Sequence, residues 1–361
     1  MIEFSVTNNA GVFQFDETNG WKKANDDIST LEIDLRKGKV GFSGLSKAID
    51  KIIKEFPSLL RAYQTKTVAA IGIMTDMQMK PSRTPAGNAG KGYRKMYDIA
   101  FETCKTGLIL AERQIPPDYN GTISCDESSN IPFLLLHHSK ILLHLLRGNY
   151  AGAAWSIEEH LRWNPSDCLG VRFLLGACYY NDGEKAKAFK CMREEEDNCV
   201  QYRYTLALLD IETNDFITAA VRLRKAFLEN AYIAETLVYG HDIPKNHYLF
   251  EPARESYHAV DEYRKQEMLS TWHANQAAMD FVRWLYNTST AIFDRADLMK
   301  QKEFLTYVPI SETEVRERAV ANIHKIFDNI TGESTAHLIR KVETRRSGCV
   351  WPWEWGMKQE E

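Results

Sequence analysis

The feature that most constrains this chain is a set of small and large residues that recurs three times between Ile131 and Leu237. The middle occurrence has the clearest spacing, with landmarks at Leu175, Gly176, Tyr179, Gly183, Ala188 and Met192. The upstream occurrence places its landmarks about 35 residues earlier, at Gly148, Tyr150, Ala153, Ile157 and Pro165. The downstream occurrence, at a slightly shorter interval, consists of Leu206, Ala207, Phe216, Ala219, Leu223 and Ala226. Small residues let two helices approach closely and large residues fill the space between helix pairs, so the pattern predicts three successive helix pairs.

The order L-G-x2-Y followed by A-x3-F resembles the tetratricopeptide repeat (TPR), with Met192 in the aromatic position and Arg172 where the first Trp would stand. The resemblance covers roughly the middle third of the chain. It implies an all-α fold, a TPR-like right-handed superhelix of antiparallel helix pairs, in which the first helix of each pair lines a concave groove. It also implies the function: a protein-interaction scaffold or regulator that binds a peptide or protein partner in that groove.

The resemblance assigns the partner contacts to the first helices of the three pairs. The residues at these offsets are His138, Ser139, Phe173, Tyr180, Asn181, Gln201, Tyr204 and Thr205. Aromatic, amide and hydroxyl groups suit a surface that packs a side chain and hydrogen-bonds a peptide backbone. Family members that grip a C-terminal carboxylate use Lys and Arg that are missing here, so that activity is not predicted. The alternative is that Phe173, Tyr180 and Tyr204 are buried by a covering segment.

The rest of the chain predicts three regions. Residues 1–42 form a strand-containing cap, because Ile2–Val6 and Leu31–Leu35 alternate apolar with polar residues. Residues 43–240 hold the TPR-like helical repeats, and residues 241–361 a helical C-terminal extension with a Trp-rich tail. Further predicted elements are a loop over 78–92, with two prolines and three glycines, and helices over 254–269, 275–288 and 312–330.

Composition excludes some partners and compartments. A net charge of -4 provides no broad cationic field, so nucleic acid is an unlikely partner. The most apolar segment, 133–146, is too short to span a bilayer and no secretory signal is visible, so no membrane association is expected. Seven cysteines without a C-x-x-C pair suit reduced thiols, which predicts a cytoplasmic protein.

No residue pattern typical of catalysis, cofactor binding or metal binding is present. The histidines at 137, 138, 144 and 160 lack the spacing of a zinc site, and no nucleophile elbow or phosphate-binding loop occurs. We therefore predict no enzyme, no cofactor and no metal. Two alternatives stay open: a nucleic-acid-associated or defence-type regulator that uses the basic segment 337–346, and an enzyme or toxin with an unrecognised site in the C-terminal third.

Two local expectations follow from the pattern. Ala153, Gly176, Ala188 and Ala219 should lie at tight helix–helix contacts, because each occupies a small-residue position of the repeat. Trp351, Trp353 and Trp355 alternate along the tail, which would place three rings on one side of an extended segment. Such rings should leave water, either as a cap on the final helices or as a ligand in the groove. The cap is preferred, because the last apolar face of a solenoid needs cover.

Overall fold

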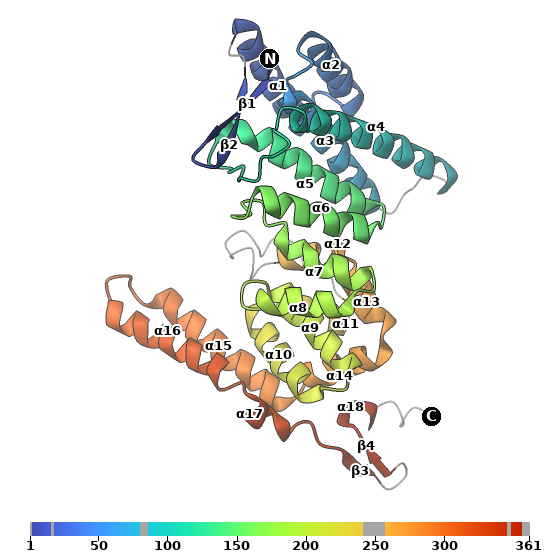
Figure 1. Ribbon diagram of the computed structural model, residues 1–361. Coiled ribbons are helices and arrows are strands. Elements are labelled where there is room, and N and C mark those ends of the chain that lie inside the picture. Colours follow the sequence, from blue (N-terminus) through green and yellow to red (C-terminus); the bar gives the residue numbers. More distant parts are fainter. Residues whose placement is uncertain (1, 16–17, 80–85, 241–256, 345–347, 356–361) are drawn as a thin grey trace. The chain divides into compact units, whose positions relative to one another are not determined.

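The computed structural model describes residues 2–15, 18–79, 86–240, 257–344 and 348–355. Within them the chain is mainly α-helical, with one two-stranded hairpin at the N-terminus and a shorter one near the C-terminus (Figure 1). The chain divides into two compact units, Met1–Glu184 and Lys185–Glu361. The predicted helical class with a small β-containing N-terminal element is therefore confirmed, whereas the TPR-like superhelix stays a prediction.

The N-terminal hairpin consists of β1 (Ile2–Thr7) and β2 (Ala10–Phe15), joined through Asn8 and Asn9, which adopt φ angles of 51° and 62°. Phe13 is fully buried, and its ring lies 5.0 Å from the rings of both Phe4 and Phe133. The buried amide of Asn130 accepts a hydrogen bond from the backbone N–H of Phe13 and donates one to the carbonyl oxygen of Gly11, both at 3.0 Å. One side chain thus satisfies two buried polar groups of β2 and fixes the hairpin beside the helix that begins at Ile131.

The second predicted strand is wrong. Residues Leu31–Leu35 lie in helix α1 (Asn19–Arg36), which buries Trp21, Ala24 and Ile28 and leaves Ile33 exposed. The short alternation of apolar residues fits a strand, but over the longer window the apolar positions recur every three or four residues, which is the period of a helix.

Three further helices of the first unit precede the middle region. They are α2 (Phe42–Glu55), α3 (Leu60–Met79) and α4 (Ala86–Glu112). The loop predicted over 78–92 is wrong at both ends, because α3 includes 78–79 and α4 includes 86–92; residues 80–85 lie outside the described ranges. Each glycine at the start of α4 costs roughly 1 kcal/mol of helix propensity. Burial of Ala100, Cys104 and Leu108 in the same helix offsets that cost.

The middle of the chain forms helices where the landmarks predict them. The first unit contains α5 (Ile131–Leu146), α6 (Tyr150–Trp163) and α7 (Arg172–Asn181), and the second contains α8 (Lys185–Glu194), α9 (Val200–Glu212) and α10 (Phe216–Glu229). Asn149 and Asp215 cap α6 and α10 by accepting hydrogen bonds from backbone N–H groups in the first turn. Gly148 supplies the positive φ of 69° that the turn between α5 and α6 requires. Ala153, Gly176, Ala188 and Ala219 are all buried, as the repeat positions predict.

Replacing Ala188 with leucine should lower the free energy of unfolding by about 1–3 kcal/mol, because the added side chain overpacks a fully buried position. Urea unfolding measures the change. The matched control is Ala186→Leu, two residues earlier on the exposed side of α8, which should leave stability nearly unchanged. Equal stability of the two variants would contradict the assignment of Ala188 to a tight contact.

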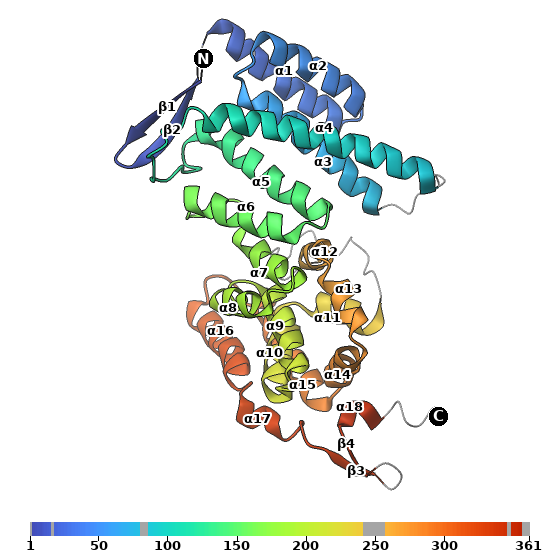
Figure 2. The ribbon, with the colours of Figure 1, turned by 45° about the vertical axis from the view of Figure 1, so that its right-hand side comes forward.

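The remaining elements belong to the second unit. They are α11 (Ala231–Tyr239), α12 (His258–Lys265), α13 (Met268–Ala274), α14 (Gln276–Tyr286), α15 (Ser289–Tyr307), α16 (Thr313–Asp328), α17 (Gly332–Ala336), β3 (Val342–Thr344), β4 (Gly348–Val350) and α18 (Pro352–Trp355). The helices predicted over 275–288 and 312–330 are confirmed as α14 and α16. The single helix predicted over 254–269 is wrong: Glu267, at φ 60°, separates α12 from α13, and residues 254–256 lie outside the described ranges. Sequence reasoning did not identify α15, which packs beside α16 as a helical hairpin (Figure 2).

The Trp-rich tail is not an extended segment with three parallel rings. Pro352 begins the one-turn helix α18, a position where its missing N–H is not needed. The rings of Trp351 and Trp353 stack at 5.1 Å, and Trp353 also contacts Phe281 of α14 at 4.6 Å. Trp355 points outward and is 49% exposed. The tail thus folds back and covers one end of α10 and α14, as the predicted cap requires, although these are not the final helices.

Candidate functional site

The predicted contact residues on α9 face the interior of the second unit. Tyr204 and Thr205 are almost completely buried. The hydroxyls of Thr205 and Tyr263 lie 3.1 Å apart, and the indole N–H of Trp272 donates to the Tyr263 hydroxyl at 2.9 Å. This face of α9 is therefore covered by α12 and α13.

Hydrogen bonds from the same face reach neighbouring backbone groups. The Tyr204 hydroxyl donates to the carbonyl oxygen of Asn230 at 2.7 Å, and the Gln201 amide donates to that of Ala259 at 3.4 Å. Burial also raises the pKa of the Tyr204 hydroxyl well above its ordinary value, so this group stays neutral. For Tyr204, the structure supports the alternative that a covering segment buries it.

The other predicted contact residues lie in the first unit, on α5 and α7. Ser139 is buried and donates to the carbonyl oxygen of Leu135, one turn earlier in its own helix. Tyr180 is buried as well, whereas His138, Phe173 and Asn181 are half-buried. Their role in partner binding stays a prediction, and it rests on the three half-buried side chains.

Two histidines form a buried pair in the first unit. His137 and His160 are fully buried, their ring centroids lie 6.2 Å apart, and none of their four ring nitrogens has a hydrogen-bond partner. Burial lowers the pKa of His137 well below its ordinary value, and the positive charge of Lys140 adds to this effect. Burial likewise lowers the pKa of His160, to about 4. Both rings are therefore neutral at pH 7, and the described residues contain no group of three side chains that could hold a metal ion.

A cavity of about 320 Å³ lies in the first unit. It is lined by Phe15, Trp21, Lys22, Asn25, Leu59, Arg61, Ser128, Ser129 and Pro132. The guanidinium of Arg61 lies 3.2 Å from the carboxylate of Glu32 and donates a hydrogen bond of 2.8 Å to the hydroxyl of Ser29. The charge of Arg61 is thus compensated within the protein.

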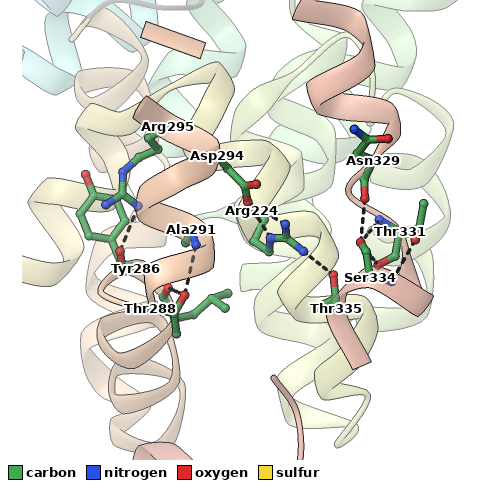
Figure 3. A network of polar contacts seen from close by, with 11 residues as sticks. Arg224, Tyr286, Thr288, Ala291, Asp294, Arg295, Asn329, Thr331, Ser334 and Thr335 are labelled. Atoms are coloured by element: carbon green, nitrogen blue, oxygen red, sulfur yellow. Dashed lines mark hydrogen bonds and ion pairs between the residues drawn. The ribbon is translucent and has the colours of Figure 1, made fainter. Parts of the chain in front are cut away.

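Ionisable groups also converge in the second unit, where α10, α15 and α17 meet. Figure 3 shows the buried guanidinium of Arg224 between Asp294 and Thr335, to which it donates hydrogen bonds of 2.8 and 2.7 Å. Thr288 begins α15 by accepting a hydrogen bond from the backbone N–H of Ala291. This cluster is a compensated ion pair that fixes α15 and α17 on α10.

The basic C-terminal segment also takes part in internal packing. The ammonium of Lys341 lies 5.1 Å from the centre of the Trp351 ring, within the range of a cation–π interaction. Arg345 and Arg346 lie outside the described residues. One cation of the basic segment 337–346 is thus engaged with the tail.

The largest exposed apolar feature lies on α15. Ala291 and Leu298 are buried, and Asp294 pairs with Arg224, so these residues define the inward side of the helix. The opposite side carries large apolar residues that are between 46% and 87% exposed: Ile292, Phe293, Met299, Phe304, Tyr307 and, just after the helix, Ile310. At 3.6 residues per turn the five residues within the helix fall on one side, together with Ala296, Lys300 and Glu303. We call these nine residues the α15 face.

The α15 face exposes a substantial apolar area. An aromatic side chain carries about 150–250 Å² of surface, so the rings of Phe293, Phe304 and Tyr307 alone expose roughly 400 Å². Monomeric soluble proteins rarely expose contiguous apolar patches beyond a few hundred Å². The signal in the sequence was the spacing of four and three residues from Ile292 through Ala296 to Met299, and of three from Phe304 to Tyr307.

No described helix is long and apolar enough to cross a membrane. Comparison with known proteins adds no identity: no protein-family model matches this sequence, and no curated protein matches it.

Proposed function

We propose that this chain is a non-catalytic protein-interaction scaffold built from TPR-like helix pairs, and that the α15 face binds a helix of its partner. The observation that carries the proposal is the exposure of three aromatic and three aliphatic side chains on one side of α15 and the turn after it. An amphipathic helix binds another protein by packing its apolar face against an apolar surface, either a groove or, as in a coiled coil, the apolar side of another helix.

The support beneath this face is rigid for a physical reason. The buried Arg224 bonds to both Asp294 and Thr335, and Leu298 packs with Leu228 and Ile330. Aromatic anchors on a fixed helix lose little conformational entropy on binding, which favours affinity.

We place the protein in a reducing, cytosol-like compartment, because no two of its seven cysteines have the spacing of a C-x-x-C pair.

The groove predicted from the TPR resemblance is a second part of the same proposal. In the first unit, the half-buried His138, Phe173 and Asn181 are the side chains that could contact an extended peptide. In the second unit, Tyr204 and Thr205 are covered by their own chain, so we assign partner binding there to α15 instead.

Partner contact at the α15 face can be tested with a photoreactive residue. A benzophenone side chain at position 307 should form covalent adducts with the partner in an extract of the source cells, and the same group at position 33 of α1 should not. Ile33 is a suitable control position, because it is exposed and apolar and lies in the first unit.

A pair of substitution variants tests the apolar contacts themselves. Phe293→Ser with Tyr307→Ser should reduce recovery of the partner about tenfold or more, since each lost anchor costs at least 1 kcal/mol. Ile33→Ser with Val68→Ser, which removes two exposed apolar side chains elsewhere, should leave recovery unchanged. Equal recovery with both variants would refute the proposal.

A further inference from the structure

We propose that the helix bound at the α15 face is α15 of a second copy of this chain, antiparallel and related by a twofold axis between Gln301 and Lys302. The inference rests on the proposed function, because it names the partner of the same face. The observation behind the inference is that two charged residues, Lys300 and Glu303, lie at the centre of the otherwise apolar α15 face.

Lys300 and Glu303 occupy the middle of the α15 face, and neither forms an ion pair within the part of the chain that the structure describes. A uniformly apolar helix over this face would remove water from both charges and offer neither of them a partner, which is unfavourable. An antiparallel copy in the stated register compensates both. Lys300 lies opposite the partner's Glu303, and Glu303 lies opposite the partner's Lys300.

The same register also matches the sizes of the apolar side chains. Ala296 lies opposite the partner's Tyr307, so the smallest residue of the face meets its largest ring. Met299 meets the partner's Phe304, and Phe293 lies beside the segment that follows the partner's α15, which holds Val308 and Ile310. Every large exposed side chain of α15 except Ile292 thereby gains an apolar or small neighbour, as a well-packed helix pair requires.

Other arrangements of two copies bring like charges together. A parallel pair in register places Lys300 beside the partner's Lys300 and Glu303 beside the partner's Glu303. Moving the antiparallel axis to residue 300 or to residue 303 places one of these residues opposite its own copy. Because like charges in an interface are strongly unfavourable, the charges select one register out of those that the apolar residues allow.

The symmetry and the area fit a closed dimer. A twofold interface uses the same patch on both subunits, so it needs a self-complementary surface. The three aromatic rings supply roughly half of the 800 Å² per partner that a stable interface buries. The flanking apolar residues of the α15 face supply further area.

Charge reversal tests the register directly. Light scattering coupled to size exclusion should show the full chain as a dimer. Lys300→Glu alone, and Glu303→Lys alone, should each weaken the dimer about tenfold or more, because each variant places two like charges opposite each other twice. Mixing the two variants in equal amounts should restore association, because the mixed dimer contains only opposite pairs. Lys300 and Glu303 are exposed, so neither substitution should disturb the fold, and circular dichroism of each variant checks this.

Each other outcome overturns the inference. A chain that is monomeric up to its solubility limit has no self-association. A dimer that neither charge reversal weakens is formed by another surface, and variants that do not recover on mixing are not paired in this register. These results leave the proposed function separately testable, because an adduct with a different protein at position 307 would identify another partner for the same face.

Discussion

Replacing Trp353 with alanine is expected to lower the free energy of unfolding by about 3–5 kcal/mol, the range typical of a buried Trp replaced by Ala. Trp353 is 7% exposed and joins the tail to two helices of the second unit. Its ring lies 4.6 Å from that of Phe281, 4.8 Å from that of Phe216 and 5.2 Å from that of Trp284. Its removal leaves a cavity among four aromatic rings, since Trp351 stacks on its other side.

Trp355 provides the matched control for this prediction. It lies two residues further along the same short helix and is 49% exposed, so Trp355→Ala should change stability by a small fraction of the Trp353→Ala effect. Urea unfolding of both variants measures the difference. If the two substitutions were equally mild, the tail would not be a structural part of the second unit.

The stability of the first unit is expected to fall steeply as the pH decreases from about 6.5 to 4. His137 and His160 cause this loss, because burial holds the pKa of both below the ordinary value of a histidine. Above pH 6.5 both rings are neutral in the folded and in the unfolded state, so they contribute no pH dependence. Below pH 6.5 the unfolded chain binds protons that the folded chain excludes, and the free energy of unfolding decreases with falling pH.

The size of this effect follows from the depressed pKa values. A histidine that stays neutral in the folded chain contributes a slope of at most about 1.36 kcal/mol per pH unit, so His160 alone should cost up to roughly 2 kcal/mol between pH 6.5 and pH 5. His137 adds a loss of the same sign. The contribution of His160 levels off near pH 4, where its folded-state pKa lies. Glu112, whose carboxylate lies 3.8 Å from His137, is too distant to form a hydrogen bond that would stabilise the protonated ring.

Variants without the histidines separate their effect from that of the carboxylates, which titrate in an overlapping range. His137→Leu with His160→Leu should flatten the dependence of stability on pH between 6.5 and 5. His324→Leu, which changes an exposed histidine of the second unit, should keep the parent's dependence. If the double variant and the parent lost stability equally over this range, the two rings would not be the cause.

The sequence alone determined where most helices lie. Small residues such as Ala153 and Ala219 predicted the elements of the middle region, because the period of such residues is a local property. It failed at Leu31–Leu35, where five residues fit both a strand and a helix. The longer window that includes Trp21, Ala24 and Ile28 has the period of a helix, and the burial of these three residues on one side of α1 agrees with it.

Tertiary structure alone decided which faces are covered and which stay in water. Tyr204 and Thr205 are residue types that suit a binding surface, yet both are buried. Residues from later in the chain cover them: the hydroxyl of Tyr263 hydrogen-bonds with that of Thr205, and the indole of Trp272 donates to Tyr263. The apolar residues of the α15 face stay exposed, because Arg224 holds α15 by its opposite side, through Asp294. A pattern along the chain shows that a helix has an apolar face, but only the long-range packing of other segments determines whether the protein itself fills that face or leaves it for a partner.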